Sequence, residues 1–289
     1  MFEELLMQGE RIISVVSNIP REEFVGTERY YYSMVVTNKR VLWVRSYSEV
    51  TYYRIAPPPL LQFIELDDID SVTVAYDSFV KCELKNGGCE FIFVAEPPSF
   101  PFPYLKQRWD NLKKKNRELA HEISRVLSEA KENSTLVIDE ILEVGEAVRY
   151  KCEHSLTTVI PFCNSRLRVF IPKSFYESLL GPIRLCITDR YVLLYELSQG
   201  PKRVKKPMLS FLSAEGTYII PKPQLNYAKI PLKNTEIRLV KRWLAYSYLE
   251  LAISGNALKL DFGNLGSKRI AEIFDKMRTA LKPVIYIVK

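Results

Sequence analysis

The chain has 289 residues, of which 47% are hydrophobic and 26% are charged. This balance is typical of a globular protein and excludes a disordered or collagen-like chain. No apolar run approaches the ~20 residues that span a bilayer, and the opening MFEELLMQGE lacks the basic region of a secretory signal. We therefore expect a soluble protein of the cytoplasm.

The net charge of +7 is unevenly spread along the chain. Residues 1–132 carry 17 Lys and Arg against 20 Asp and Glu, whereas residues 133–289 carry 24 against 14. A basic half points to an anionic partner, namely anionic lipid, nucleic acid or an acidic protein surface. A basic but inert half would give the same numbers, so this alternative stays open.

The five cysteines do not predict a disulfide framework, because their number is odd and no C-x-x-C occurs. Cys82 and Cys89 flank the turn KNGG, so they could face each other across a hairpin as a reduced pair of core residues. Cys152, His154 and Cys163 are three potential zinc ligands, but a structural site requires four and usually contains a knuckle. We predict no metal and no cofactor.

In chain order, seven strands are expected first. Thr37-Asn38-Lys39 is a credible hairpin turn because Asn tolerates the left-handed backbone, and NGG at 86–88 is the strongest turn signal. Apolar and β-branched runs place the strands at 11–16, 30–36, 40–44, 63–66, 71–76, 80–84 and 89–96.

One long helix follows these strands. Leu105, Trp109, Leu112, Leu119, Ile123, Val126 and Ala130 recur at three- and four-residue steps. This period predicts an amphipathic helix of about 25 residues. Lys113, Lys114 and Lys115 lie on its exposed side.

The same order of elements restarts after residue 143. Strands are expected within 144–152, 183–188, 191–197, 227–241, 245–253 and 257–262, followed by a helix through Ile270 and Leu281. Repetition of one order predicts two domains, 1–132 and 143–289, joined by a short linker at 132–142. The second copy is longer, with insertions at about 153–182 and 198–226, and the tail 283–289 is expected to add a strand.

A small set of residues recurs in both copies. Gly9-Glu10, Thr37-Asn38-Lys39-Arg40 and Ile64-Glu65-Leu66 correspond to Gly145-Glu146, Thr188-Asp189-Arg190 and Ile230-Pro231-Leu232. The combination resembles the pleckstrin-homology-like (PH-like) superfamily, in particular the bacterial and archaeal PH-like and GRAM-like domains. This resemblance implies a mainly β fold with α, made of two tandem bent seven-stranded barrels that are each closed by a C-terminal helix. It also implies binding to anionic lipids, peptides or histones.

Three basic segments of the second copy are the candidate anion-binding sites. Arg166, Arg168 and Lys173 are interleaved with apolar and aromatic residues, as at an anionic membrane boundary. The other two segments are a Pro-bounded loop and a pair beside Trp243; their cations are Lys202, Arg203, Lys205 and Lys206, and Lys241 and Arg242. Each segment also has a structural alternative: the first could be an extra element packed on the domain, the second a solvated loop, and the third the surroundings of a partly buried Trp243.

Catalytic signals are weak, because no nucleophile elbow, P-loop or dinucleotide fingerprint occurs and the two histidines are His121 and His154. We predict a non-enzymatic adaptor. Its basic second domain engages anionic lipid head groups at the inner membrane face, and its near-neutral first domain holds a protein partner. The alternatives are nucleic-acid or chromatin-type binding, and an oligomeric structural or assembly protein.

Overall fold

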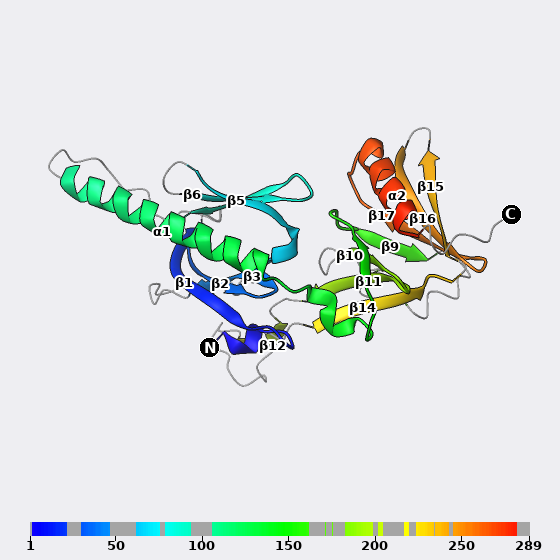
Figure 1. Cartoon of the computed structure of the whole chain (residues 1–289), viewed down its shortest axis with the longest axis horizontal. Coiled ribbons are helices and arrows are strands. Elements are labelled where there is room, and N and C mark those ends of the chain that lie inside the picture. Colours follow the sequence, from blue (N-terminus) through cyan, green and yellow to red (C-terminus); the bar gives the residue numbers. More distant parts are fainter. Residues whose placement is uncertain are drawn as a thin grey trace, which may run out of the picture. The chain divides into compact units, whose positions relative to one another are not determined.

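The computed structural model (Figure 1) describes residues 2–21, 30–46, 62–75, 79–93, 106–161, 171, 175, 183–198, 202–204, 217–219, 224–233, 235–242 and 245–281. The chain divides into two compact units. Unit 1 comprises Met1–Glu140 and Gln199–Lys222, and unit 2 comprises Ile141–Ser198 and Pro223–Lys289. Strands predominate over helices in the described residues, which confirms the predicted mainly β fold with α.

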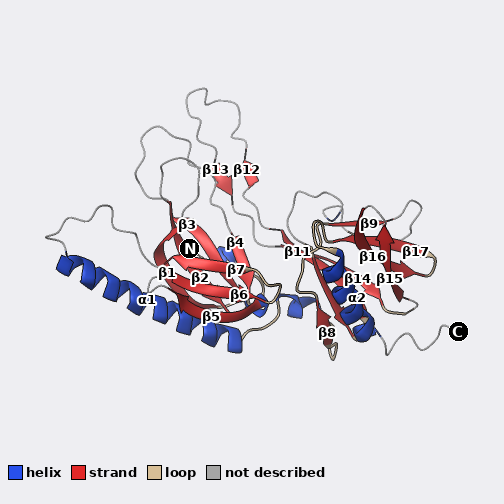
Figure 2. Cartoon of the chain, turned by 90° about the horizontal axis from the view of Figure 1, so that it is seen from above, coloured by secondary structure: helices blue, strands red, loops and turns tan. Residues whose placement is uncertain are grey.

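Unit 1 contains two larger antiparallel sheets, one two-stranded sheet and one long helix (Figures 1 and 2). The first sheet has the order β1-β2-β3-β4, with β1 (Ile12–Arg21), β2 (Tyr30–Thr37), β3 (Arg40–Ser46) and β4 (Gln62–Glu65). The second sheet has the order β5-β6-β7, with β5 (Ile69–Ala75), β6 (Phe79–Leu84) and β7 (Cys89–Phe93). Helix α1 (Lys106–Glu132) follows, and 3-10 helices η1 (Glu3–Leu5), η2 (Leu66–Asp68) and η4 (Val137–Ile141) complete the unit.

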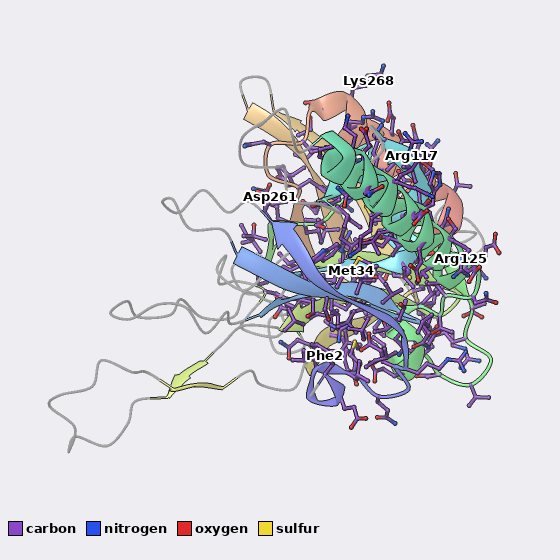
Figure 3. All side chains as sticks on the ribbon, turned by 90° about the vertical axis from the view of Figure 1, so that its left-hand side faces the viewer. Phe2, Met34, Arg117, Arg125, Asp261 and Lys268 are labelled. Carbon is purple, nitrogen blue, oxygen red and sulfur yellow. The ribbon has the colours of Figure 1, made fainter. Side chains whose placement is uncertain are left out.

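The core of unit 1 follows from the period of two along its strands. Met34 pairs with Trp43 in the β2–β3 register, and both belong to the main cluster that also contains Ile123 and Leu127 of α1. Their neighbours Val35 and Leu42 face the other side of the sheet and pack there with Leu5 and other residues. Alternate side chains of β2 and β3 therefore fill two separate apolar clusters, and Figure 3 labels Met34 on the strand that carries both.

Unit 2 repeats this order with one addition. Its first sheet has the order β14-β11-β10-β8, and its second has the order β15-β16-β17-β9. The bounds are β8 (Val148–Lys151), β9 (Thr158–Pro161), β10 (Arg184–Thr188), β11 (Tyr191–Ser198), β14 (Gln224–Pro231), β15 (Thr235–Arg242), β16 (Ala245–Ile253) and β17 (Asn256–Asp261). Helix α2 (Ser267–Leu281) packs Ile270, Ile273 and Met277 into the core. The pair β12 (Lys202–Val204) and β13 (Thr217–Ile219) is grouped with unit 1.

The described strands do not form closed seven-stranded barrels. They form separate open sheets of four, three and two strands in unit 1, and of four and four strands in unit 2. The added strand is β9, which lies within the expected first insertion and pairs with β17. The tail 283–289 lies outside the described residues.

Cys82 and Cys89 do not face each other across the β6–β7 hairpin. The register pairs Cys82 with Glu90 and Glu83 with Cys89. A shift of one residue places the two thiols on opposite faces of the sheet. Accordingly Cys82 is buried and Cys89 is exposed, and both are free thiols.

Candidate functional site

The Gly-Glu entry and the Thr-containing turn of unit 1 meet in a buried charged junction. Arg40 donates from Nε to Glu10 Oε1 and from Nη2 to Glu10 Oε2, both at 2.8 Å. Thr37 donates from Oγ1 to Glu10 Oε1 at 2.7 Å, and the Met7 N–H donates to Oε2 at 2.7 Å. Arg40 Nη2 also donates to the Leu5 carbonyl at 2.8 Å. The carboxylate and the guanidinium form a bidentate pair that is fully removed from solvent.

The turn itself is held by its own polar side chains. Thr37 Oγ1 accepts hydrogen bonds from the backbone N–H groups of Lys39 at 3.1 Å and Arg40 at 2.9 Å. Asn38 Oδ1 accepts from the Arg11 N–H at 2.8 Å, and Asn38 Nδ2 donates to Thr135 Oγ1 at 3.1 Å. The Thr37 and Asn38 side chains thus connect neighbouring segments of unit 1, which gives them an architectural role.

The junction predicts a specific dependence of stability on pH. Burial raises the pKa of Glu10, but the hydrogen bonds and positive charge of Arg40 outweigh it, so that the pKa lies below its ordinary value. The stabilisation is therefore complete above the unfolded pKa of about 4.3 and is lost as the pH falls through the lower folded pKa. In urea titrations at a series of pH values, Glu10→Gln is expected to flatten the fall in unfolding free energy below about pH 5. An unchanged slope would contradict this assignment.

Unit 2 contains a corresponding junction around Glu146. Thr188 donates from Oγ1 to Glu146 Oε1 at 2.5 Å, and the Glu143 N–H donates to Oε2 at 2.8 Å. Lys229 Nζ lies 3.8 Å from Glu146 Oε2 and 3.7 Å from Glu143 Oε1, and Arg190 Nη1 pairs with Glu143 Oε2 at 3.1 Å. Tyr191 donates its hydroxyl to Glu143 Oε1 at 3.0 Å. The Glu146 carboxylate is fully buried, as the Glu10 carboxylate is.

The two junctions exchange the positions of a cation and an aromatic ring. In unit 1, the third residue after the turn Thr is Arg40, which lies 5.6 Å from the ring centroid of Phe63 on β4. In unit 2, the third residue after Thr188 is Tyr191, and Lys229 on β14 lies 5.2 Å from its ring centroid. Phe63 and Lys229 occupy equivalent register positions, opposite Leu42 and Leu193. Each unit therefore keeps one cation–π pair beside its buried carboxylate.

The backbone around both junctions also repeats. Gly9 and Gly145 have positive φ angles of 68° and 75° and precede the buried Glu residues. Equivalent hydrogen bonds run from Leu66 N to Lys39 O and from Leu232 N to Arg190 O, both at 2.9 Å. The two junctions are thus matched in backbone as well as in side-chain chemistry.

The predicted anion-binding residues are largely beyond the part of the chain that the structure describes. Arg166, Arg168, Lys173, Lys205 and Lys206 lie outside it altogether. Only the backbone is described for the remaining four, which are Lys202 and Arg203 on β12, and Lys241 and Arg242 on β15. Because the side chains of these nine residues are not described, their role in anion binding stays a prediction.

Unit 2 has an open groove of about 590 Å³ beside β8 and α2. Its lining residues are Arg149, Tyr150, Asp275, Lys276, Thr279 and Ala280. Lys276 pairs with Glu153 at 2.8 Å, and Asp275 pairs with Arg278 at 3.5 Å. Burial raises the pKa of Tyr150, which keeps the phenol neutral. Sequence reasoning missed this groove because its residues come from two distant segments, and no motif marks it.

Cys152, His154 and Cys163, the three potential zinc ligands, are only partly within the described ranges, and inside those ranges no group of three or more His, Cys, Asp or Glu is arranged to hold a metal ion. Cys152 is buried, and burial raises the pKa of its thiol. Burial lowers the pKa of His154. Cys163 lies outside the described residues.

No family model matches the chain, and no curated protein matches it. Within the described residues, no helix is both long and apolar enough to cross a membrane.

Proposed function

We propose that the chain is a non-enzymatic adaptor in which the basic unit 2 binds anionic lipid head groups and unit 1 holds a protein partner. The observation that carries this proposal is the charge of the two units. Unit 1 has 22 Lys and Arg against 23 Asp and Glu, whereas unit 2 has 19 against 11. The excess of positive charge belongs to one unit, and it favours an anionic surface.

We further propose that both units are diverged PH-like domains. The matched junctions around Glu10 and Glu146 support a common origin, as does the shared order of strands before a closing helix. The open paired sheets and the capping helix are compatible with a strongly bent form of that fold. Each of the two buried carboxylates accepts hydrogen bonds from its own unit, which gives it a structural role.

Vesicle co-sedimentation tests the proposal. We expect the protein to sediment with vesicles of phosphatidylcholine and phosphatidylserine, and to stay in the supernatant with phosphatidylcholine alone. The triple variant R166E/R168E/K173E is expected to weaken binding by about 100-fold, because each basic residue near an anionic membrane contributes about 1 kcal/mol.

The matched control reverses three other exposed cations of unit 2, in K233E/R238E/K268E. If the control variant loses as much affinity for the vesicles, the effect of the triple variant is due to net charge alone. If the wild-type protein does not bind anionic vesicles, lipid binding is refuted. Binding to duplex DNA that falls steeply with salt would favour the nucleic-acid alternative instead.

A further inference from the structure

The segments that follow the two closing helices correspond residue by residue. Three buried positions of α1 recur as buried positions of α2 at an interval of 150 residues, namely Ala120 with Ile270, Ile123 with Ile273 and Leu127 with Met277. The same interval pairs Thr135 with Ile285, and the triplet 136–138 with the triplet 286–288. These triplets are Leu-Val-Ile and Tyr-Ile-Val, so the chain after α2 repeats the apolar pattern of the chain after α1.

In unit 1, the segment after α1 folds back onto the Thr37-Asn38 turn. Thr135 donates its N–H to the Asn38 carbonyl at 2.9 Å, and Asn38 Nδ2 donates to Thr135 Oγ1 at 3.1 Å. Asn38 also joins the start of the first strand, because its N–H donates to the Arg11 carbonyl at 3.2 Å and its Oδ1 accepts from the Arg11 N–H at 2.8 Å. The chain that leaves the helix therefore closes over the turn.

The turn of unit 2 has the same geometry around Asp189. Its N–H donates to the Ala147 carbonyl at 2.9 Å, and its Oδ1 accepts from the Ala147 N–H at 3.1 Å, as Asn38 does with Arg11. Among the described residues, however, no N–H donates to the Asp189 carbonyl as that of Thr135 does to Asn38. The residue that corresponds to Thr135 is Ile285, which lies outside the described residues.

The groove of unit 2 lies between the end of α2 and this turn. Arg149 and Tyr150 of β8 form one wall, and Ala280, in the last turn of α2, belongs to the other. Arg149 is two residues after Ala147, which bonds the turn, and Ala280 is next to Leu281, where α2 ends. Figure 2 shows β8 beside α2. A chain that leaves α2 and returns to Asp189 thus has the groove on its path.

The polar side chains of the groove are already engaged or solvated. Lys276 and Asp275 form ion pairs with residues outside the groove, and Thr279 Oγ1 donates to the Asp275 carbonyl at 2.9 Å. Arg149 is exposed, so its guanidinium can stay in water at the rim while its stem lines the wall. Because these groups give a polar ligand little to bind, the groove favours an apolar occupant.

Residues 284–288 fit this groove in composition and in length. They are Val-Ile-Tyr-Ile-Val, and the groove offers them Tyr150 and Ala280, which both pack against the core of unit 2. Five extended residues cover about 16 Å, whereas the groove follows α2 from residue 275 to residue 280, which is about 8 Å of helix. Pro283 cannot continue α2, so the chain is free to turn back at this point.

We propose that residues 283–288 fold back over the groove between β8 and α2. The Ile285 N–H donates to the Asp189 carbonyl, and the apolar side chains of the segment cover Tyr150 and Ala280. The segment is attached beside the groove and is therefore present there at a high effective concentration, which favours it over a separate apolar peptide. This inference goes beyond the proposed function and does not depend on it.

Hydrogen exchange of the full wild-type chain, resolved to single amides, tests the proposed hydrogen bond. We expect the Ile285 amide to exchange at least roughly 100-fold more slowly than in an unstructured peptide of the same sequence, because an N–H that donates to a carbonyl is protected. The Lys289 amide lies beyond the proposed contact and serves as the internal control, which should exchange at the unstructured rate.

Disulfide formation provides an independent measurement. In D189C/I285C, the two thiols occupy the positions of Asn38 and Thr135, whose side chains are in contact in unit 1. With oxidised glutathione as the oxidant, we expect an intramolecular disulfide to form at least about tenfold faster than in the matched control K268C/I285C. Lys268, labelled in Figure 3, is exposed in the first turn of α2, about 20 Å of helix from the end at Leu281.

The inference is overturned if the Ile285 amide exchanges at the unstructured rate, or if the two cysteine pairs oxidise equally fast. A disulfide that joins two chains would assign the groove to a second copy and would overturn it as well. None of these results bears on binding to anionic vesicles, so failure of this inference is distinct from failure of the proposed function.

Discussion

Arg40→Met is expected to lower the free energy of unfolding of unit 1 by about 3–5 kcal/mol, because it leaves the buried Glu10 carboxylate without its cation. Glu10 keeps its hydrogen bonds from Thr37 and Met7, but these do not neutralise a charge that is fully removed from water. Hydrogen exchange of the β2 and β3 amides, followed by mass spectrometry, reports the stability of unit 1 separately from that of unit 2.

Two comparison variants make this result interpretable. Lys85→Met breaks the exposed pair with Asp67, whose atoms are 3.4 Å apart, and is expected to cost less than about 1 kcal/mol. Glu10→Gln with Arg40→Met removes both charges and should cost less than the sum of the single changes. Additive costs, or an Arg40→Met effect as small as that of Lys85→Met, would show that the pair does not control stability.

Exchange of the cation and the ring is expected to rescue most of this loss. Arg40→Tyr alone removes the cation and should cost about 3–5 kcal/mol, and Phe63→Lys alone adds a second cation beside Arg40. The double variant places the ring after the turn Thr and the cation on the neighbouring strand, as with Tyr191 and Lys229 in unit 2, but unit 1 has Met7 where unit 2 has Glu143. We expect a favourable coupling of at least about 2 kcal/mol between the two changes.

The same hydrogen-exchange measurement on both single variants and the double variant completes a thermodynamic cycle. A matched control combines Arg40→Tyr with Phe63→Met, which alters the same two positions without supplying a cation. If this control recovers stability as well as Phe63→Lys does, the two junctions are not equivalent. The proposed common origin of the two units then loses its strongest support.

Local patterns in the sequence predicted most of the elements. The expected strands at 30–36 and 40–44 correspond to β2 and β3, and the long amphipathic period corresponds to α1. These elements are specified by alternation and by steps of three and four residues. Asn38 does mark the β2–β3 turn, but it acts through side-chain hydrogen bonds and not through the expected left-handed backbone. The mainly β fold with α followed from the order of these patterns.

Pairings between distant residues were not predictable in this way. The recurrence of Gly-Glu was visible, but the contact of Glu10 with Arg40 joins residues 30 positions apart. The β6–β7 register, which separates Cys82 from Cys89, depends on the conformation of the hairpin turn, and the residue types of KNGG alone did not define that conformation. The groove lined by Arg149 and Lys276 depends on long-range packing in the same way.

The added strand β9 also affects the order in which unit 2 folds. It pairs with β17, so that Val159 lies opposite Leu260 across about one hundred intervening residues. A ribosome that has just completed β9 has not yet synthesised its partner, and this pairing must wait until nearly all of unit 2 has emerged. The sheet containing β9 is therefore completed late, after β8, β10, β11 and β14 are available to pair with one another.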